Sequence, residues 1–314
     1  MKMSLLSIIV PCYNEEETVE LFYNAAEKVH QQLAMDFEYI FVNDGSKDKT
    51  LIQLRNLAKK HSNVRYLSFS RNFGKEAALY AGLKAAQGDL ITVMDADLQD
   101  PPELLPEMIQ AIELEGYDCV GTRRTTREGE PPIRSFFAKM FYRIVNRIGE
   151  VEMVDGARDY RLMTRQMVDA ILELSEYNRF SKGLFSWVGY KTKYISFENR
   201  ERVAGETSWS FWKLFKYSID GIINFSETPL NIASFIGAFS CIGAGLAMIF
   251  IIIKTLIFKD PTSGWPSLVT IILFMGGLQL LCIGIIGKYI GKIFLETKKR
   301  PIYIVQETEK TRRD

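Results

Sequence analysis

The sequence predicts an α/β protein, with a doubly wound and mostly parallel sheet followed by an amphipathic interface helix and two transmembrane helices. Over the first 120 residues short apolar runs alternate with amphipathic stretches, and after residue 229 two long stretches carry no charge. The 314 residues are 47% hydrophobic and 25% charged, enough for a sizeable core, and the net charge of +1 argues against a general nucleic-acid binder.

Five strands are expected in the N-terminal part, because five runs are rich in Ile, Val and aromatic residues. They cover 5–10, 39–43, 64–69, 90–95 and 117–121. The first helix between them is expected to begin at an Asn14 cap, with Glu17 as its capping-box partner, and the third is alanine-rich and close-packing. Residues 122–205 contain basic and aromatic segments and give no clear order of elements.

Polar residues follow four of these strands, at 11–15, 43–46, 70–72 and 95–97. In a doubly wound sheet, ligands bind at the carboxyl ends of the strands. The sequence therefore predicts that these four segments meet at one edge of the sheet and form a site there.

The segment MDADLQDPPE (94–103) places four carboxylates close together, and they must repel one another. Asp95 and Asp97 suit a divalent cation bound through oxygen, with Gln99 as a neutral ligand, and such a cation would offset the repulsion. A solvated acidic turn before the next helix is the alternative. Asp100 to Glu103 are expected to turn the chain and start that helix, with proline in its first turn.

The sequence predicts a membrane anchor in the C-terminal part of the chain. Residues 207–225 carry a helical apolar stripe flanked by lysines, which suits a helix in the membrane interface, although an ordinary core-facing helix is the alternative. The stripe consists of Trp209, Trp212, Phe215, Ile219 and Ile222. Residues 232–253 and 265–287 each carry no charge and are long enough to cross a bilayer. Small residues at 233, 237, 241 and 245 would pack within the hairpin or in a homo-oligomer.

The positive-inside rule orients this anchor. Basic residues at 288–300 predict a cytoplasmic flank, so the N-terminal domain is expected on the cytoplasmic side of the cell membrane. The expected division is a catalytic domain (1–206), a juxtamembrane helix (207–228), a two-helix hairpin (229–296) and a cytoplasmic tail (297–314). No signal peptide is expected. The four cysteines form no CxxC pair, so reduced thiols are expected, without zinc or disulfides.

Several motifs carry a resemblance to a known family. PCYNEE, VNDGS and DADLQDPPE, each after a strand, resemble the inverting family 2 glycosyltransferases of GT-A fold. DLQDPPE, SRNFGKEAAL (70–79) and RFSKG (179–183) are similar to the polyprenyl-phosphate glycosyltransferases, which include bactoprenol glucosyltransferases and dolichol-phosphate mannose synthases. The resemblance covers roughly residues 5–300, and the two spans match the bacterial membrane-anchored branch.

The resemblance implies an enzyme that transfers a hexose from a nucleoside-diphosphate sugar to undecaprenyl phosphate, with inversion, using Mg²⁺ or Mn²⁺. Glucose is the first expectation, N-acetylglucosamine the second and mannose from GDP-mannose the third. The product would be a polyprenyl-phosphate sugar for cell-wall or surface glycans. The implied nucleotide-binding residues are Pro11, Tyr13, Glu15, Asp44 and Asp95, and the implied metal ligands are Asp95, Asp97 and Gln99, with Asp97 also catalytic.

On the acceptor side, phosphate requires cationic side chains, and guanidinium groups suit its oxygens. The candidates are Arg123, Arg127, Arg134, Arg200 and Arg202. Arg202, in RERVAGETSW, matches the Arg-rich loop that the resemblance places before the membrane helices. Asp159, in RDYRLM, matches a segment whose aspartate acts as base or acceptor organiser, and a structural pairing with Arg161 is its alternative. Arg158 stands where that segment would carry a small residue.

Three competing classes fit less well. A processive polysaccharide synthase would carry a Gln-x-x-Arg-Trp motif and more spans, and this chain has no Arg-Trp pair. A non-catalytic anchored nucleotide-binding protein would be expected to lack the paired aspartates. A transporter is disfavoured because neither span contains a charge that would mark an ion pathway.

Overall fold

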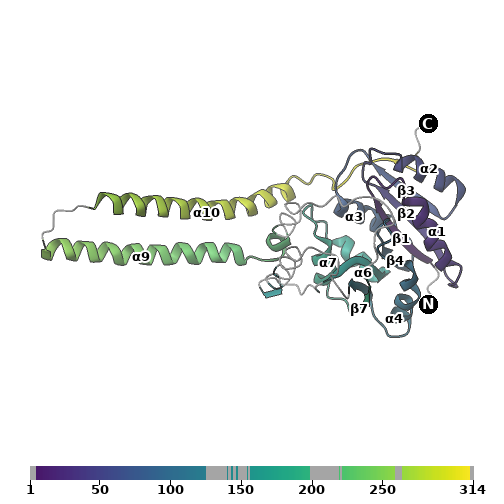
Figure 1. Ribbon diagram of the computed structural model, residues 1–314, viewed down its shortest axis with the longest axis horizontal. Helices are drawn as coiled ribbons and strands as arrows, with labels where there is room; N and C mark the ends of the chain where they lie inside the picture. Colours follow the sequence, from purple (N-terminus) through teal and green to yellow (C-terminus); the bar gives the residue numbers. More distant parts are fainter. Residues whose placement is uncertain are drawn as a thin grey trace.

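The computed structural model describes residues 5–124, 140, 143, 146–147, 154, 156–198, 219, 221–258 and 264–311. One sheet of eight strands, in the order β7-β5-β6-β4-β1-β2-β3-β8, carries helices on both faces, and a long two-helix hairpin extends from it (Figure 1). The strands are β1 (Leu5–Cys12), β2 (Asp36–Asn43), β3 (Val64–Phe69), β4 (Leu90–Val93), β5 (Cys119–Arg124), β6 (Ala157–Thr164), β7 (Thr192–Phe197) and β8 (Val305–Thr308).

The centre of the sheet is parallel, as the alternation of strands and helices predicted. β1 pairs in parallel with β2 and β4, and β2 pairs in parallel with β3. β6 is antiparallel to both β4 and β5, and β8 is antiparallel to β3. All five expected strands are present, while β6, β7 and β8 were not expected. The predicted fold class, an α/β doubly wound sheet, is confirmed.

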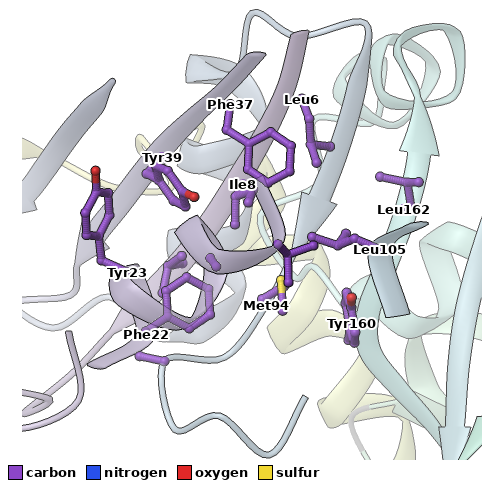
Figure 2. Packing of buried hydrophobic residues seen from close by; sticks show 14 of the residues in the cluster. Leu6, Ile8, Phe22, Tyr23, Phe37, Tyr39, Met94, Leu105, Tyr160 and Leu162 are labelled. Carbon is purple, nitrogen blue, oxygen red and sulfur yellow. The ribbon is translucent and has the colours of Figure 1, made fainter. Parts of the chain in front are cut away.

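Two buried clusters hold the helices on opposite faces of this sheet, because side chains alternate along each strand. On one face lie α1 (Val19–His30), α2 (Thr50–Lys60) and α4 (Leu105–Glu113), and Phe22 of α1 belongs to the same cluster as the strand residues Ile8 and Tyr39 (Figure 2). On the other, α3 (Lys75–Ala85), α6 (Arg165–Glu173) and α7 (Ser181–Trp187) cover Ile9 and its neighbours. The expected close packing of α3 is confirmed, since a Cβ on Gly82 would lie 2.2 Å from Ile9 Cγ2.

The expected start of the first helix is wrong. α1 begins at Val19, and Asn14 has a left-handed φ of 57°, so it does not cap a helix. Its side-chain oxygen instead accepts from the backbone N–H of Lys47 at 2.9 Å, a contact that local sequence cannot reveal. The helix after the acidic segment is confirmed: a short 3₁₀ turn, η1 (Pro102–Leu104), begins with proline and leads into α4.

The two apolar stretches form α9 (Thr228–Phe258) and α10 (Trp265–Thr297), the long hairpin of Figure 1. Both are long and apolar enough to cross a membrane, and the apolar windows that qualify them are exposed rather than buried in the protein. Near its base the hairpin is packed: Ala233 is buried, and the Cys282 thiol lies 3.7 Å from its carbonyl oxygen. Cys241, further along the same stripe of small residues, is exposed.

Hydrogen bonds join the base of the hairpin to the sheet domain. The carboxylate of Glu296, on α10, accepts from the backbone N–H groups of Tyr177 and Asn178 at 2.9 Å each. The side-chain amide of Asn224, just before α9, donates to the Asn178 carbonyl at 2.7 Å, and Lys292 donates to Asn224 at 2.5 Å. α10 and the segment just before α9 are thus tied to the residues that lead into α7.

The chain then returns to the sheet. It runs from α10 across the domain and ends beside α2 and β3 (Figure 1). Tyr303 stacks on Phe69 with ring centroids 5.0 Å apart, and β8 pairs with β3. The buried Glu307 carboxylate receives both the Arg55 guanidinium fork and the Tyr66 hydroxyl, the latter at 2.6 Å. The segment 297–314, expected as a tail, therefore supplies the edge strand of the sheet.

Replacing Glu307 by alanine is expected to lower the free energy of unfolding by about 2–3 kcal/mol, because Arg55 and the Tyr66 hydroxyl lose their shared partner. The measurement is thermal unfolding of the full chain in detergent, followed by circular dichroism. Glu20→Ala is the matched control: Glu20 faces Lys60 at 3.7 Å in an exposed pair, and its loss should cost under about 0.5 kcal/mol. Equal effects of the two changes would show that β8 is not held by Glu307.

Candidate active site

The carboxyl ends of the parallel strands meet as predicted. Hydrogen bonds link the loop after β1 to the loop after β2: the backbone N–H of Asn14 donates to Ser46 Oγ at 2.9 Å, and that of Glu15 donates to Thr50 Oγ1 at 2.8 Å. The loop after β2 in turn contacts the loop after β3 through Asp44 and Gly45. Three of the four polar segments therefore form one connected edge.

Asp44 fixes the start of α3. Its buried carboxylate accepts from the backbone N–H of Phe73 at 2.6 Å and from that of Gly74 at 3.0 Å. Burial raises the pKa of Asp44, and the two amides offset part of that rise. The residue thereby sets where Lys75, the first residue of α3, is placed; its expected contact with a nucleoside stays a prediction.

Gly45 is required by two separate constraints. Its φ of 63° lies in the left-handed region, and a Cβ there would lie 2.4 Å from the backbone carbonyl carbon of Arg71. No side chain can occupy that space without moving the backbone after β3. The VNDGS segment thus combines turn chemistry with a close approach of two loops.

Lys75 lies between two carboxylates. Its Nζ is 2.7 Å from Asp95 Oδ1, 3.0 Å from Asp95 Oδ2 and 2.7 Å from Asp159 Oδ2. The strand register explains the meeting: Val93 of β4 faces Arg161 of β6, so two residues further on, Asp95 and Asp159 emerge side by side. The Arg161 side chain contacts Asp159 only at its backbone: it lies over the Phe185 ring at 3.8 Å and donates to the backbone carbonyls of Asp159 at 3.4 Å and Arg158 at 3.1 Å.

The charges of this group shift its pKa values. Burial alone would lower the pKa of Lys75, but Asp159 and Asp95 outweigh it and raise that pKa. Burial likewise opposes ionisation of Asp159, yet Lys75, Lys182 and Arg161 hold its pKa well below the usual range. Lys75 therefore stays protonated and Asp159 stays ionised near neutral pH.

A second cation compensates the rest of the acidic segment. Arg158 Nε donates to Asp100 Oδ1 at 3.0 Å, and Arg158 Nη2 donates to Gln99 Oε1 at 3.3 Å. Asp100 is almost fully buried, and burial raises its pKa to about 6 although Arg158 works in the opposite direction. Asp100 is thus more than a turn residue: it anchors the acidic loop to β6.

Asp95 and Asp97 suit a divalent cation as a pair. Among the described residues, no group of three or more His, Cys, Asp or Glu side chains could hold a metal ion. Mg²⁺ commonly uses only one or two protein carboxylates and completes its shell with phosphate and water. Asp97, which is mostly buried, already accepts from the Gln99 backbone N–H at 3.1 Å. The Gln99 amide oxygen accepts from Arg158, so its expected part as a metal ligand stays a prediction.

The remaining predicted residues are spread around this centre. Pro11 lies within β1 opposite Val42, and Tyr13 is 40% exposed beyond the strand end. The Glu15 carboxylate accepts from the Thr18 hydroxyl at 2.6 Å. Arg123, at the end of β5, donates to Ser196 at 2.8 Å. The other acceptor-side candidates, Arg127, Arg134, Arg200 and Arg202, lie outside the described residues.

Two central residues, Lys75 and Arg158, were not predicted. The sequence does offer one indication for Lys75. A cation in the first turn of a helix opposes the helix dipole, so its presence there suggests a specific partner. Arg158 was noticed only as a departure from the expected small residue. The sequence could not predict these ion pairs, because Asp159 lies 84 residues from Lys75 and Asp100 lies 58 residues from Arg158.

Comparison with known proteins places the chain in one class of enzymes, the glycosyltransferases. The chain belongs to glycosyl transferase family 2, whose sequence profile matches residues 7–172. It is 45% identical over 314 residues to the putative glycosyltransferase CsbB of Bacillus subtilis, covering 100% of this chain and 95% of that one. It is 40% identical over 305 residues to the prophage bactoprenol glucosyl transferase homolog of Escherichia coli, covering 97% and 99%.

Among solved structures, glucosyl-3-phosphoglycerate synthase from Mycobacterium tuberculosis, in complex with Mn²⁺, UDP-glucose and phosphoglyceric acid, is similar with a TM-score of 0.47. The two sequences are 19% identical, and the match covers 71% of this chain and 78% of that one. The expected family and enzyme class are thus confirmed by the family profile and the curated relatives.

Gly45→Ala is expected to destabilise the protein by more than about 3 kcal/mol, because the added Cβ meets the backbone of Arg71 as well as a strained φ. Gly116→Ala is the matched control: its φ is +67° and its Cβ would meet nothing within 4 Å, so only the left-handed strain of about 1–2 kcal/mol remains. Thermal unfolding of both variants measures the difference. If the two variants melt together, the close approach at Gly45 contributes nothing.

Proposed function

We propose that this chain transfers a hexose, with glucose favoured, from a nucleoside-diphosphate sugar to a polyprenyl phosphate such as undecaprenyl phosphate, inverting the anomeric carbon. The observation that carries the proposal is the similarity over nearly the whole chain, hairpin included, to a relative named for bactoprenol glucosyl transfer. The acidic pair supports the donor half of the reaction, and the two apolar helices support an acceptor that resides in the membrane.

On the donor side, Asp95 and Asp97 would hold Mg²⁺ or Mn²⁺ together with the sugar diphosphate. When bound, such a cation neutralises charge that develops on the leaving diphosphate. Tyr13, exposed at the mouth of the site, offers a ring face for the nucleoside base. Glu15 and Asp44 join the same edge through contacts with Thr50 and Phe73, and Pro11 lies near the end of β1 opposite Val42.

On the acceptor side, a phosphate oxygen attacks the anomeric carbon while the bond from that carbon to the nucleoside diphosphate breaks. A phosphate monoester has a second pKa of about 6, so near neutral pH it needs no general base. Asp159, held ionised by Lys75, would be a poor base, and we assign it the part of an organiser. Arg123 and the arginines at 127, 134, 200 and 202 remain the proposed acceptor-phosphate residues, with Arg202 foremost.

An apolar cavity supports a lipid acceptor. It measures about 450 Å³ and lies at the base of the hairpin, among Ile222, Pro229, Leu281, Ile285 and the Lys288–Tyr289 pair. This volume falls within the usual range of ligand pockets. Its lining is apolar apart from Lys288 and Tyr289, which suits a hydrocarbon chain that ends in an anionic group.

We further propose that the enzyme is a multi-pass protein of the cell membrane with its catalytic domain in the cytoplasm. The basic residues beyond 287 support this orientation through the positive-inside rule. The proposed division is the catalytic domain 1–206, the juxtamembrane helix 207–228 and the hairpin 229–296, with 297–314 returning to the catalytic sheet. The sugar-lipid would then serve cell-wall or surface glycans. The part of the small-residue stripe around the exposed Cys241 is a candidate contact between copies.

The full chain in membranes or detergent should move label from UDP-[¹⁴C]glucose into the chloroform phase when undecaprenyl phosphate is added, and EDTA should abolish the transfer. UDP-N-acetylglucosamine and GDP-mannose form the comparison panel. Label that accumulates as a long polymer would instead indicate a processive synthase. Absence of lipid-linked label with every donor would refute the proposed reaction.

Asp97→Ala is expected to lower kcat at least about 100-fold, because it removes one of the two carboxylates available to the cation. Asp169→Ala, on the exposed face of α6, is the control and should retain wild-type turnover. Both variants are checked for folding by circular dichroism. Near-normal turnover of a folded Asp97→Ala protein would contradict the metal assignment.

A further inference from the structure

Lys75 is held in place from both sides of its own backbone. On one side, Asp44 accepts from Phe73 and Gly74, the two residues before it. On the other, the carboxylate of Glu76 accepts from the backbone N–H of Ser181 at 2.9 Å, which ties the first turn of α3 to α7. The position of the lysine is therefore fixed, and only its side chain can respond to a ligand.

Both carboxylate oxygens of Asp95 face this side chain, at 2.7 Å and 3.0 Å from Nζ. A divalent cation bound at Asp95 therefore competes with the ammonium for the same oxygens, and the two positive charges repel each other. Asp159, on β6 beside Asp95, is the second carboxylate of this ammonium, at 2.7 Å from the same Nζ. Three other cations close by in the described part of the chain are already engaged: Arg158 with Asp100, Lys182 with the Ala157 carbonyl, and Arg161 with the backbone carbonyls of Asp159 and Arg158.

We propose that Lys75 is a positioning residue that couples the donor half of the site to the acceptor half. Without donor, Lys75 occupies Asp95 and Asp159 together. When the cation and the sugar diphosphate arrive, Lys75 leaves Asp95, stays on Asp159 and turns its freed N–H donors to the acceptor phosphate. An ammonium has three donors, so it can serve a carboxylate and a phosphate at once. The inference rests on the proposed function and makes productive acceptor binding follow donor binding.

The coupling predicts opposite effects from two substitutions on binding of Mn²⁺ alone, measured by electron paramagnetic resonance on the full chain in detergent. Lys75→Met frees Asp95 and should tighten Mn²⁺ binding about tenfold. Asp159→Asn leaves the ammonium to Asp95 alone and should weaken Mn²⁺ binding about threefold. Lys84→Met, on the exposed last turn of α3, is the matched control and should bind Mn²⁺ like the wild type.

Kinetics supply the second readout. In Lys75→Met, the KM for undecaprenyl phosphate should rise about tenfold while the KM for the sugar nucleotide does not rise. Lys75→Arg keeps the charge and should restore wild-type Mn²⁺ affinity. The Mn²⁺ measurement needs no turnover, so it tests the part of Lys75 even if the enzyme transfers no sugar. Conversely, glucose transfer by the wild type supports the proposed function whatever the Lys75 variants show.

The proposal is overturned if folded Lys75→Met binds Mn²⁺ no more tightly than Lys84→Met, or if no variant binds Mn²⁺ at all. Should Lys75→Met fail to unfold cooperatively, Asp159→Asn decides the matter: unchanged or tighter Mn²⁺ binding in that variant contradicts the shared counter-ion. A parallel rise in both KM values, with Mn²⁺ binding unchanged, would reveal a purely structural lysine.

Discussion

Asp95, Asp97, Asp100 and Glu103 follow one another closely after β4, and their mutual repulsion has to be offset before the strand end can take one conformation. The protein uses two cations from different elements: Lys75 from α3 faces Asp95, and Arg158 from β6 faces Asp100. These two ion pairs tie the start of α3 and the strand β6 to the loop after β4. Through these ion pairs the acidic loop is held by α3 and by β6.

The acidic residues of this segment differ in their surroundings. Asp95 is partly exposed and Asp97 is mostly buried at the carboxyl edge of the sheet. A cation with its own phosphate ligands is suited to such a two-carboxylate site. Asp100 lies in the interior and serves the fold. Asp159 is brought to the donor side by the antiparallel register of β4 and β6, although it is far away in sequence. One acidic segment thus contributes both to the candidate site and to the packing of the fold.

Local pattern was sufficient for the parallel half of the fold. β3 was predicted at its observed bounds, and the alanine-rich α3 packs closely on β1, because alternation and small side chains act over a few residues. Contacts over long separations were out of reach. Asn14 was assigned a cap because its bond to Lys47 is not local, and β8 was missed because its short sequence VQET is polar and its pairing needs a strand over 230 residues earlier. The pair Asp95 and Asp97 could be predicted from the sequence, but the counter-ion Lys75 could not.

The return of the chain to the sheet sets an order of events during synthesis. β3 has no partner on its outer side until residues 305–308 have left the ribosome, and these residues come after both apolar helices. An open strand edge is a template for pairing with other chains. The catalytic sheet therefore reaches its final number of strands only after the hairpin has been translated. A chain that stops before residues 305–308 would leave this edge open, so completion of the catalytic sheet depends on synthesis of both apolar helices.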